Sequence, residues 1–315
     1  MEFFKSGTRI DFVAKMPLCL VISAVLVVAS WALMLTKGFN FGIDFAGGTL
    51  VEVQLGEASG DADEGRVRGA LGELGFNDGS IVRVGAPEER TFRINLPASQ
   101  EEDRDLSLKI VSGLSEKLGA PVEVRSVESI GPRVGGELRR TALQAILLSW
   151  IGILLYIWFR FEWQYAPGAV VALVHDISIT AGLFSLFGWE FDLQVLAALL
   201  VIIGYSINDT IVIYDRIRET VSVRGTSELE SVVNEATNGT LSRTILTSGL
   251  TQLAVVAILV LGGPVLRGFS LALFIGIIVG TYSSIFIASA LLIRLSRRYG
   301  HPAPAKTGAK ARASS

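Results

Sequence analysis

The stretch GYSINDTIVIYDRIRE, residues 204–219, places Asn208 and Asp209 inside an otherwise apolar run, residues 193–214. That run is long enough to cross a bilayer as a helix. A carboxylate in a membrane span costs about 2.5–3.5 kcal/mol on insertion scales, so it normally faces a bundle interior or a wet cavity. Asp209 is therefore a candidate for carrying a proton, the alternative being a carboxylate that ties two helices together without titrating.

The composition is that of a membrane protein. Half of the residues are apolar, 18% are charged and the mean hydropathy is +0.50. A net charge of −2 provides no basic field for nucleic acid. Cys19 is the single cysteine, so no internal disulfide can form, and His175 and His301 lie far apart, so we predict no metal site. The sequence contains no nucleophile–base pair and no phosphate-binding loop, which argues against an enzyme.

Six apolar segments reach the length of a transmembrane helix. They predict a polytopic α-helical membrane protein with spans at residues 17–36, 141–159, 166–187, 193–214, 244–261 and 269–293. The first run is too long for the apolar core of a signal peptide, and no convincing cleavage site follows it, so we interpret it as a retained anchor.

Basic residues predict the orientation. They precede the first span in residues 1–16, and they recur in the loop at residues 215–243 and in the tail at 294–315. The positive-inside rule therefore places both termini in the cytoplasm. We interpret the loop as partly helical, either lying on the end of the bundle or forming a docking site. The tail is predicted to be disordered after about residue 299.

The same orientation places residues 37–140 on the side of the membrane away from the cytoplasm. Alternating apolar residues predict strands at 49–55, 81–84, 91–96 and 121–127, and apolar residues at helical spacing predict helices at 62–74 and 106–118. The order β-α-β-β-α-β is typical of a ferredoxin-like α+β domain. A segment of about a hundred residues is long enough to bury its own core.

Other polar residues lie in or near the spans. Arg243, at the start of the fifth span, could meet Asp209 at a similar depth, or its side chain could extend to the interface. Thr247 lies one turn further along, where a hydroxyl can also bond its own helix. Asp176, in the third span, is either a helix tie or a second relay group. His175 and Asp176 point in different directions as helix neighbours, so they need not pair.

Small residues recur at a spacing of four in the sixth span, at Gly276, Gly280, Ser284 and Ala288. This pattern allows close helix approach. The pattern leaves open whether the stripe packs within the bundle or against another protein.

Five motifs, in order along nearly the whole chain, resemble those of the SecF branch of the SecD/SecF family of protein-export membrane proteins. They are FNFGIDFAGGT (39–49), IGPRVGGELRRTA (130–142), ALVHDI (172–177), SINDTIVIYDRIRE (206–219) and SRTILTS (242–248). The fourth motif is also similar to the proton-relay helix of resistance-nodulation-division pumps. Where those pumps have two acids, this chain has Asn208 and Asp209, which leaves one titratable group in the helix.

The resemblance implies a subunit that uses the proton-motive force, together with SecD, to promote late translocation and release of preproteins across the bacterial inner membrane. The implied partners are SecD, the SecYEG channel, the unfolded preprotein and the bilayer, with YidC and YajC as further candidates; protons are the coupling ion and no other cofactor is implied. By the resemblance, the relay residues would be Asp209 and Arg243, at the interface with SecD; Thr247, Asn208 and Asp176 are further candidates from their positions in the spans. The alternatives are half of a proton-coupled small-molecule efflux transporter and a translocase scaffold that conducts nothing.

Overall fold

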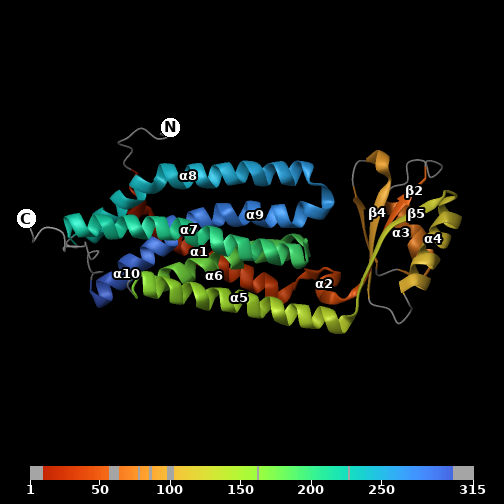
Figure 1. Cartoon of the computed structure of the whole chain (residues 1–315), viewed down its shortest axis with the longest axis horizontal. Coiled ribbons are helices and arrows are strands. Elements are labelled where there is room, and N and C mark those ends of the chain that lie inside the picture. Colours follow the sequence, from red (N-terminus) through yellow and green to blue (C-terminus); the bar gives the residue numbers. More distant parts are fainter. Residues whose placement is uncertain are drawn as a thin grey trace, which may run out of the picture.

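A bundle of long helices carries a small sheet domain at one end (Figure 1). Among the residues that the structure describes, six helices are long and apolar enough to cross a membrane, and the fold class predicted from the sequence is confirmed. The computed structural model describes residues 10–56, 64–76, 79–84, 87–97, 103–161, 163–225 and 228–300.

The spanning helices are longer than their apolar runs. They are α1 (Phe12–Thr36), α5 (Pro132–Arg160), α6 (Ala166–Phe187), α7 (Leu193–Arg224), α8 (Leu229–Leu261) and α9 (Gly263–Ser283), the last continuing through a π-helix (Ser284–Ala288) into α10 (Ser289–Tyr299). The structure departs most from the prediction at 215–243, which was predicted as a partly helical loop, because α7 and α8 extend through nearly all of it. Val232, Val233 and Ala236 are buried there, so tertiary packing stabilises helix beyond the apolar run.

The helices form an inner and an outer set. About half or more of the apolar window of α6, α7 and α9 is buried within the molecule, whereas less than a fifth is buried in α1, α5 and α8. The inner helices therefore form the core of the bundle. The outer helices present their apolar side chains to lipid or to another protein.

The domain at residues 48–130 has the predicted ferredoxin-like order. Strands β2 (Gly48–Leu55), β3 (Ser80–Val84), β4 (Thr91–Pro97) and β5 (Val122–Ile130) form an antiparallel sheet in the order β3-β4-β2-β5. Helices α3 (Glu64–Glu73) and α4 (Asp103–Leu118) cover the sheet face that points away from the bundle (Figure 1). Val51, Ile94 and Ile110 are fully buried between the sheet and these helices. The domain thus has its own hydrophobic core.

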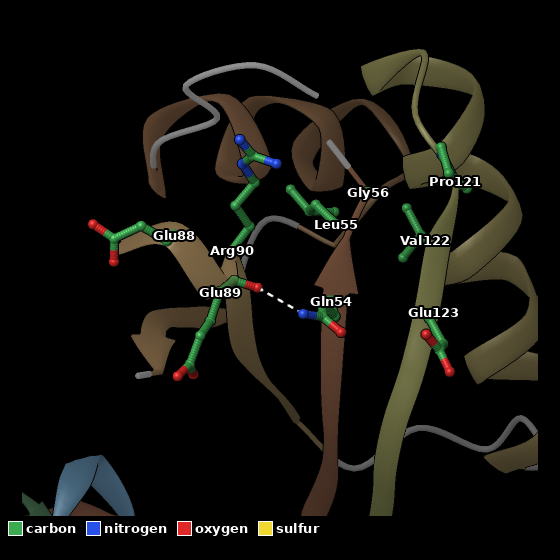
Figure 2. A pocket seen from close by; sticks show the side chains of 9 residues that line it. All are labelled: Gln54, Leu55, Gly56, Glu88, Glu89, Arg90, Pro121, Val122 and Glu123. Atoms are coloured by element: carbon green, nitrogen blue, oxygen red, sulfur yellow. Dashed lines mark hydrogen bonds between the residues drawn. The ribbon is translucent and has the colours of Figure 1, made fainter. Parts of the chain in front are cut away.

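The domain has a hollow of about 370 Å³ where β2 ends (Figure 2). A 3₁₀ turn, η2 (Pro87–Glu89), lies on one side of it and the start of β5 lies on the other. The side chain of Gln54 donates a hydrogen bond to the carbonyl of Glu89 across the hollow, at 3.0 Å. The domain joins the helices at Gly48, the first residue of β2. The hollow lies at the other end of this strand.

Three short elements join the domain to the bundle. Strands β1 (Asn40–Phe41) and β6 (Glu190–Phe191) pair in parallel, and α2 (Ile43–Ala46) follows β1. Gly48, the first residue of β2, has a φ of +146°, and a Cβ there would lie 2.3 Å from the carbonyl oxygen of Leu96. Only glycine can make this close approach without strain. We call β1, α2, β6 and the first turn of α7 the interdomain joint.

The stripe of small residues packs within the bundle, between α9 and α7. A Cβ on Gly276 would lie 2.2 Å from Cδ1 of Ile202, and one on Gly280 would lie 3.1 Å from Cβ of Ser206. One turn further on, the Ser284 and Thr210 hydroxyls are 2.8 Å apart. Close approach of two helix backbones is the usual role of such stripes in membranes.

We expect Gly276→Ala to lower the stability of the bundle by about 1–3 kcal/mol, because the added methyl group overlaps Ile202. Gly152→Ala in α5 is the matched control, since nothing lies within 4 Å of its Cβ position and alanine is the better helix former. Thermal unfolding of the purified protein in detergent measures both. Equal midpoints for the two variants would contradict the close packing of α7 on α9.

Candidate functional site

Asp209 is buried in the middle of the bundle, with 2% of its surface exposed. Its Oδ2 accepts a hydrogen bond from the Ser248 hydroxyl of α8, at 3.2 Å. The same hydroxyl lies 3.0 Å from that of Thr281 on α9. The carboxylate of α7 is therefore connected through hydroxyl groups to two neighbouring helices. A change in its charge alters its hydrogen bonding to both of them.

The other predicted residues near Asp209 lie on the outside of the bundle. Arg243, Thr247 and Asn208 are all exposed. Thr247 donates its hydroxyl to the carbonyl of Arg243 in its own helix, at 3.0 Å. Within the described part of the chain, the Arg243 guanidinium makes no ion pair and no hydrogen bond, but its positive charge interacts electrostatically with the Asp209 carboxylate. Arg243 and Asn208 are thus exposed polar residues on two helices, α8 and α7, that pack against each other.

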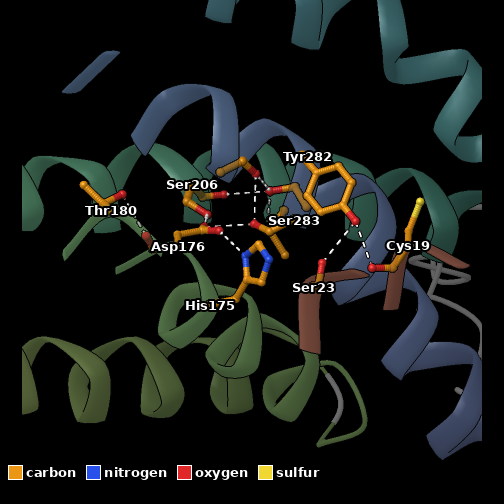
Figure 3. Close-up of polar contacts among 11 residues, drawn as sticks. Cys19, Ser23, His175, Asp176, Thr180, Ser206, Tyr282 and Ser283 are labelled. Carbon is orange, nitrogen blue, oxygen red and sulfur yellow. Dashed lines mark hydrogen bonds and ion pairs between the residues drawn. The ribbon is translucent and has the colours of Figure 1, made fainter. Parts of the chain in front are cut away.

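Asp176 is fully buried and accepts three hydrogen bonds (Figure 3). Its Oδ2 accepts from Ser206 of α7 at 2.6 Å and from Ser283 of α9 at 2.9 Å, and its Oδ1 lies 2.9 Å from Nδ1 of His175. His175 and Asp176 thus interact although they are neighbours on one helix. Three donors from three helices stabilise a buried carboxylate strongly, because hydrogen bonds to charged groups are the strong ones.

The two carboxylates share the helices that hold them. Helix α7 contributes both Asp209 and, three residues earlier, the Ser206 that binds Asp176. Helix α9 contributes Thr281 toward Asp209 and Ser283 toward Asp176. The π-helix Ser284–Ala288 follows directly, and π-helical turns are frequent at functional sites. A shift of α7 against α9 would therefore alter both carboxylate environments.

Sequence reasoning missed the hydroxyl groups that hold the carboxylates: Ser206, Ser248, Thr281 and Ser283. A serine or threonine in a helix can donate to its own backbone, as Thr247 does. The sequence therefore does not reveal which hydroxyls turn toward a neighbouring helix. A partial signal existed in the stripe of small residues on α9, since it marks the face that α7 approaches.

The interdomain joint attaches the sheet domain to the start of α7. Asp192 caps this helix, its Oδ1 accepting from the Val195 amide at 2.8 Å, and Asp44 of α2 accepts from the Leu193 amide at 3.0 Å. Both carboxylates satisfy free amides at the positive end of the helix dipole. Side-chain contact continues into the sheet, because the Asn95 amide of β4 donates to Oε1 of Glu190 at 3.2 Å.

Two carboxyl groups of the joint have raised pKa values. Burial is the main cause of the raised pKa of Glu190, and the negative charges of Asp192 and Asp44 add to it. Burial also raises the pKa of Asp192, again with a contribution from Asp44. Like charges in a partly buried site disfavour ionisation. The joint therefore contains electrostatic repulsion at neutral pH that protonation relieves.

Comparison with known proteins identifies the family. Residues 110–298 match the family described as protein export membrane protein SecD/SecF, C-terminal, and residues 32–58 match the SecD/SecF GG motif. The protein translocase subunit SecF of Calditerrivibrio nitroreducens is 43% identical over 93% of this chain and 96% of its own length. SecF of Pseudomonas aeruginosa is 44% identical over 93% of both chains.

Solved structures agree with this assignment. The crystal structure of SecDF from Thermus thermophilus, a translocon-associated membrane protein, matches 94% of this chain with a TM-score of 0.82 and 38% identity. A SecDF structure in a super-membrane-facing form matches the same share with a TM-score of 0.71. This chain spans 40% of the length of each SecDF chain. The chain belongs to the SecD/SecF family of protein export membrane proteins, and within it to the SecF subunits of the protein translocase, which are transport proteins and not enzymes.

Proposed function

We propose that the chain couples proton movement through the membrane to preprotein export, and that Asp209 carries the proton. The observation that supports this role is the burial of a single carboxylate of α7 among hydroxyls of α8 and α9. Ionisable groups inside membrane spans are costly and commonly belong to proton pathways. A helix tie without a proton function would leave the exposed Arg243, whose charge acts on Asp209, without a role.

A partner carboxylate is needed beside Arg243. Its guanidinium stays charged in a membrane and cannot be satisfied by lipid tails. Because Arg243 and Asn208 are exposed on the neighbouring helices α8 and α7, we propose that SecD covers them and supplies the carboxylate. The SecDF relatives contain more than twice the sequence matched here, so they have room for such a partner segment.

The coupling step is a change of pairing. Neutralising Asp209 weakens its acceptance of the Ser248 hydrogen bond, because charge-assisted hydrogen bonds are about twice as strong as neutral ones. Arg243 then pairs with Asp209 in the ionised state and with the partner carboxylate in the neutral state. A ligand shifts a conformational equilibrium only through such a difference between the two states.

The interdomain joint would transmit the shift. Helix α7 carries Asp209 at its centre, and its first turn binds Asp44 of the joint. A movement of α7 along its axis therefore acts on α2 and on the sheet domain. The two SecDF structures support such mobility, since they match this chain at equal identity but with TM-scores of 0.82 and 0.71.

The setting follows from the orientation predicted by the basic residues. Both termini lie in the cytoplasm, the ferredoxin-like domain lies in the periplasm, and the chain works in the inner membrane beside SecYEG, with YidC and YajC as further neighbours. In this setting the sheet domain contacts unfolded preprotein as it emerges. The proton-motive force then promotes the late stage of translocation and the release of the preprotein.

We assign Asp176 a supporting role in this proposal. Its three donors leave it fully hydrogen-bonded, which favours a tie between α6, α7 and α9 over a group that exchanges protons. A tie at this point keeps α7 in register with α9 while Asp209 titrates.

The first prediction concerns Asp209. In cells depleted of the native subunit, we expect Asp209→Asn to export a secreted precursor no faster than uncomplemented cells, because the amide cannot exchange a proton, whereas Asp209→Glu retains part of the rate. Pulse-chase labelling measures export, with the membrane level of each variant checked. Asp215→Asn is the matched control, since Asp215 is exposed on the same helix and pairs with Arg160 at 3.6 Å. Wild-type export by Asp209→Asn would favour the scaffold alternative.

A second prediction separates the roles of the two carboxylates. We expect Asp176→Asn to lower the free energy of unfolding by about 1.5–3 kcal/mol, because it loses charge-assisted hydrogen bonds. Export per folded molecule should remain near that of the wild type. Thermal unfolding and pulse-chase export are measured on the same variant. A variant of unchanged stability that does not export would instead make Asp176 a relay group.

A third prediction concerns pH. The raised pKa of Glu190 means that the folded protein binds protons more tightly than the unfolded chain, so stability falls as pH rises from the ordinary value of 4.5 through the raised pKa. Glu190→Gln removes the buried charge and keeps an acceptor for Asn95. We expect it to raise the unfolding midpoint at neutral pH and to match the wild type below pH 4.5. If Glu190→Gln changed the unfolding midpoint by the same amount at both pH values, ionisation of Glu190 would not be what destabilises the joint.

A further inference from the structure

A groove of about 520 Å³ lies between α1 and the C-terminal part of the bundle, at the end away from the sheet domain. Its floor is one face of α1, with Val13, Pro17, Leu20 and Ala24 recurring every three or four residues. Ile293 of α10 forms part of the opposite wall. The side chains along its length are apolar, so water is a poor occupant.

Charged residues gather at one end of this groove. Arg294 and Arg297 of α10 and Glu230 of α8 line it. Arg297 forms an ion pair with Glu230, while Arg294 is exposed and pairs with no acidic group in the described residues. The mouth of the groove therefore has a net positive charge and one arginine available to an anion.

The dimensions suit a single lipid. From Val13 to Ala24, α1 rises about 16 Å at 1.5 Å per residue, close to half of a hydrocarbon core about 30 Å thick. The charged mouth lies toward the start of α1 and the end of α10, the side that the predicted orientation places at the cytoplasmic headgroups. An acyl chain of one leaflet thus matches the floor, and a phosphate matches Arg294.

We propose that this groove binds one anionic phospholipid, with its phosphate on Arg294 and an acyl chain along α1. Basic pockets between transmembrane helices are known to select such headgroups. The bound lipid would connect the first and last helices of the bundle, which lie far apart in sequence. The binding itself depends neither on Asp209 nor on proton coupling, so the two proposals can fail independently.

Native mass spectrometry of the full chain in detergent tests this proposal. Phosphatidylglycerol and phosphatidylcholine with identical acyl chains are titrated, and the fraction of protein that retains one lipid is measured. We expect phosphatidylglycerol to be retained about fivefold better, the effect of one basic group near an anionic headgroup. Arg294→Gln should abolish this preference. Glu230→Gln should increase it, because the mouth gains a positive charge.

Two controls separate charge from shape. Arg298→Gln removes a neighbouring cation that stacks on Tyr299 and does not line the groove, so the preference should remain. Ala24→Trp fills the apolar floor and should lower retention of both lipids. Equal retention of the two lipids by the wild type would overturn the proposal, as would a loss of preference in Arg298→Gln equal to that in Arg294→Gln. Occupation of the groove by a second copy of the chain would appear as a dimer and would also contradict it.

Discussion

Each of the two buried carboxylates in this bundle needs hydrogen-bond donors that lipid cannot supply. Asp176 and Asp209 lie within apolar helices, and the energetic cost of an unsatisfied charge there is large. The donors are hydroxyls of small side chains on adjacent helices. Small side chains are also what allows α9 to approach α7 closely. Ser206 serves both purposes, because it donates to Asp176 and lies directly against Gly280 of α9.

This arrangement divides the bundle into parts with different tasks. Asp176, with three donors, holds the inner helices together, whereas Asp209, held by one hydroxyl, can change its pairing. Helix α7 then links the membrane interior to the interdomain joint, where Asp44 and Asp192 bind its first turn. In the proposed mechanism, the exposed Arg243 lies on the face where SecD would complete the site.

The sequence predicted the elements better than the contacts between them. The six spans followed from apolar runs, and the cost of burying a carboxylate singled out Asp209. The helix ends differed, because packing extends α7 and α8 beyond their apolar runs. Thr247 and Ser248 show why the site predicted from the sequence was incomplete. Thr247 donates to the backbone of its own helix, whereas the next hydroxyl, Ser248, donates to Asp209 on α7. The two-residue pairing of β1 with β6 joins segments about 150 residues apart and carries no local signal.

The central claim is that the charge of Asp209 sets the position of the sheet domain. Spin labels at Ser112→Cys on α4 and Leu261→Cys at the end of α8, with Cys19 replaced by alanine, would measure that position in liposomes with SecD present. Electron–electron distances are compared at one neutral pH between Asp209 and Asp209→Asn, which mimics the protonated state. We predict a shifted distance distribution in the Asn variant, and a return to the original distribution with Asp209→Glu. Identical distributions for Asp209 and Asp209→Asn would contradict the account.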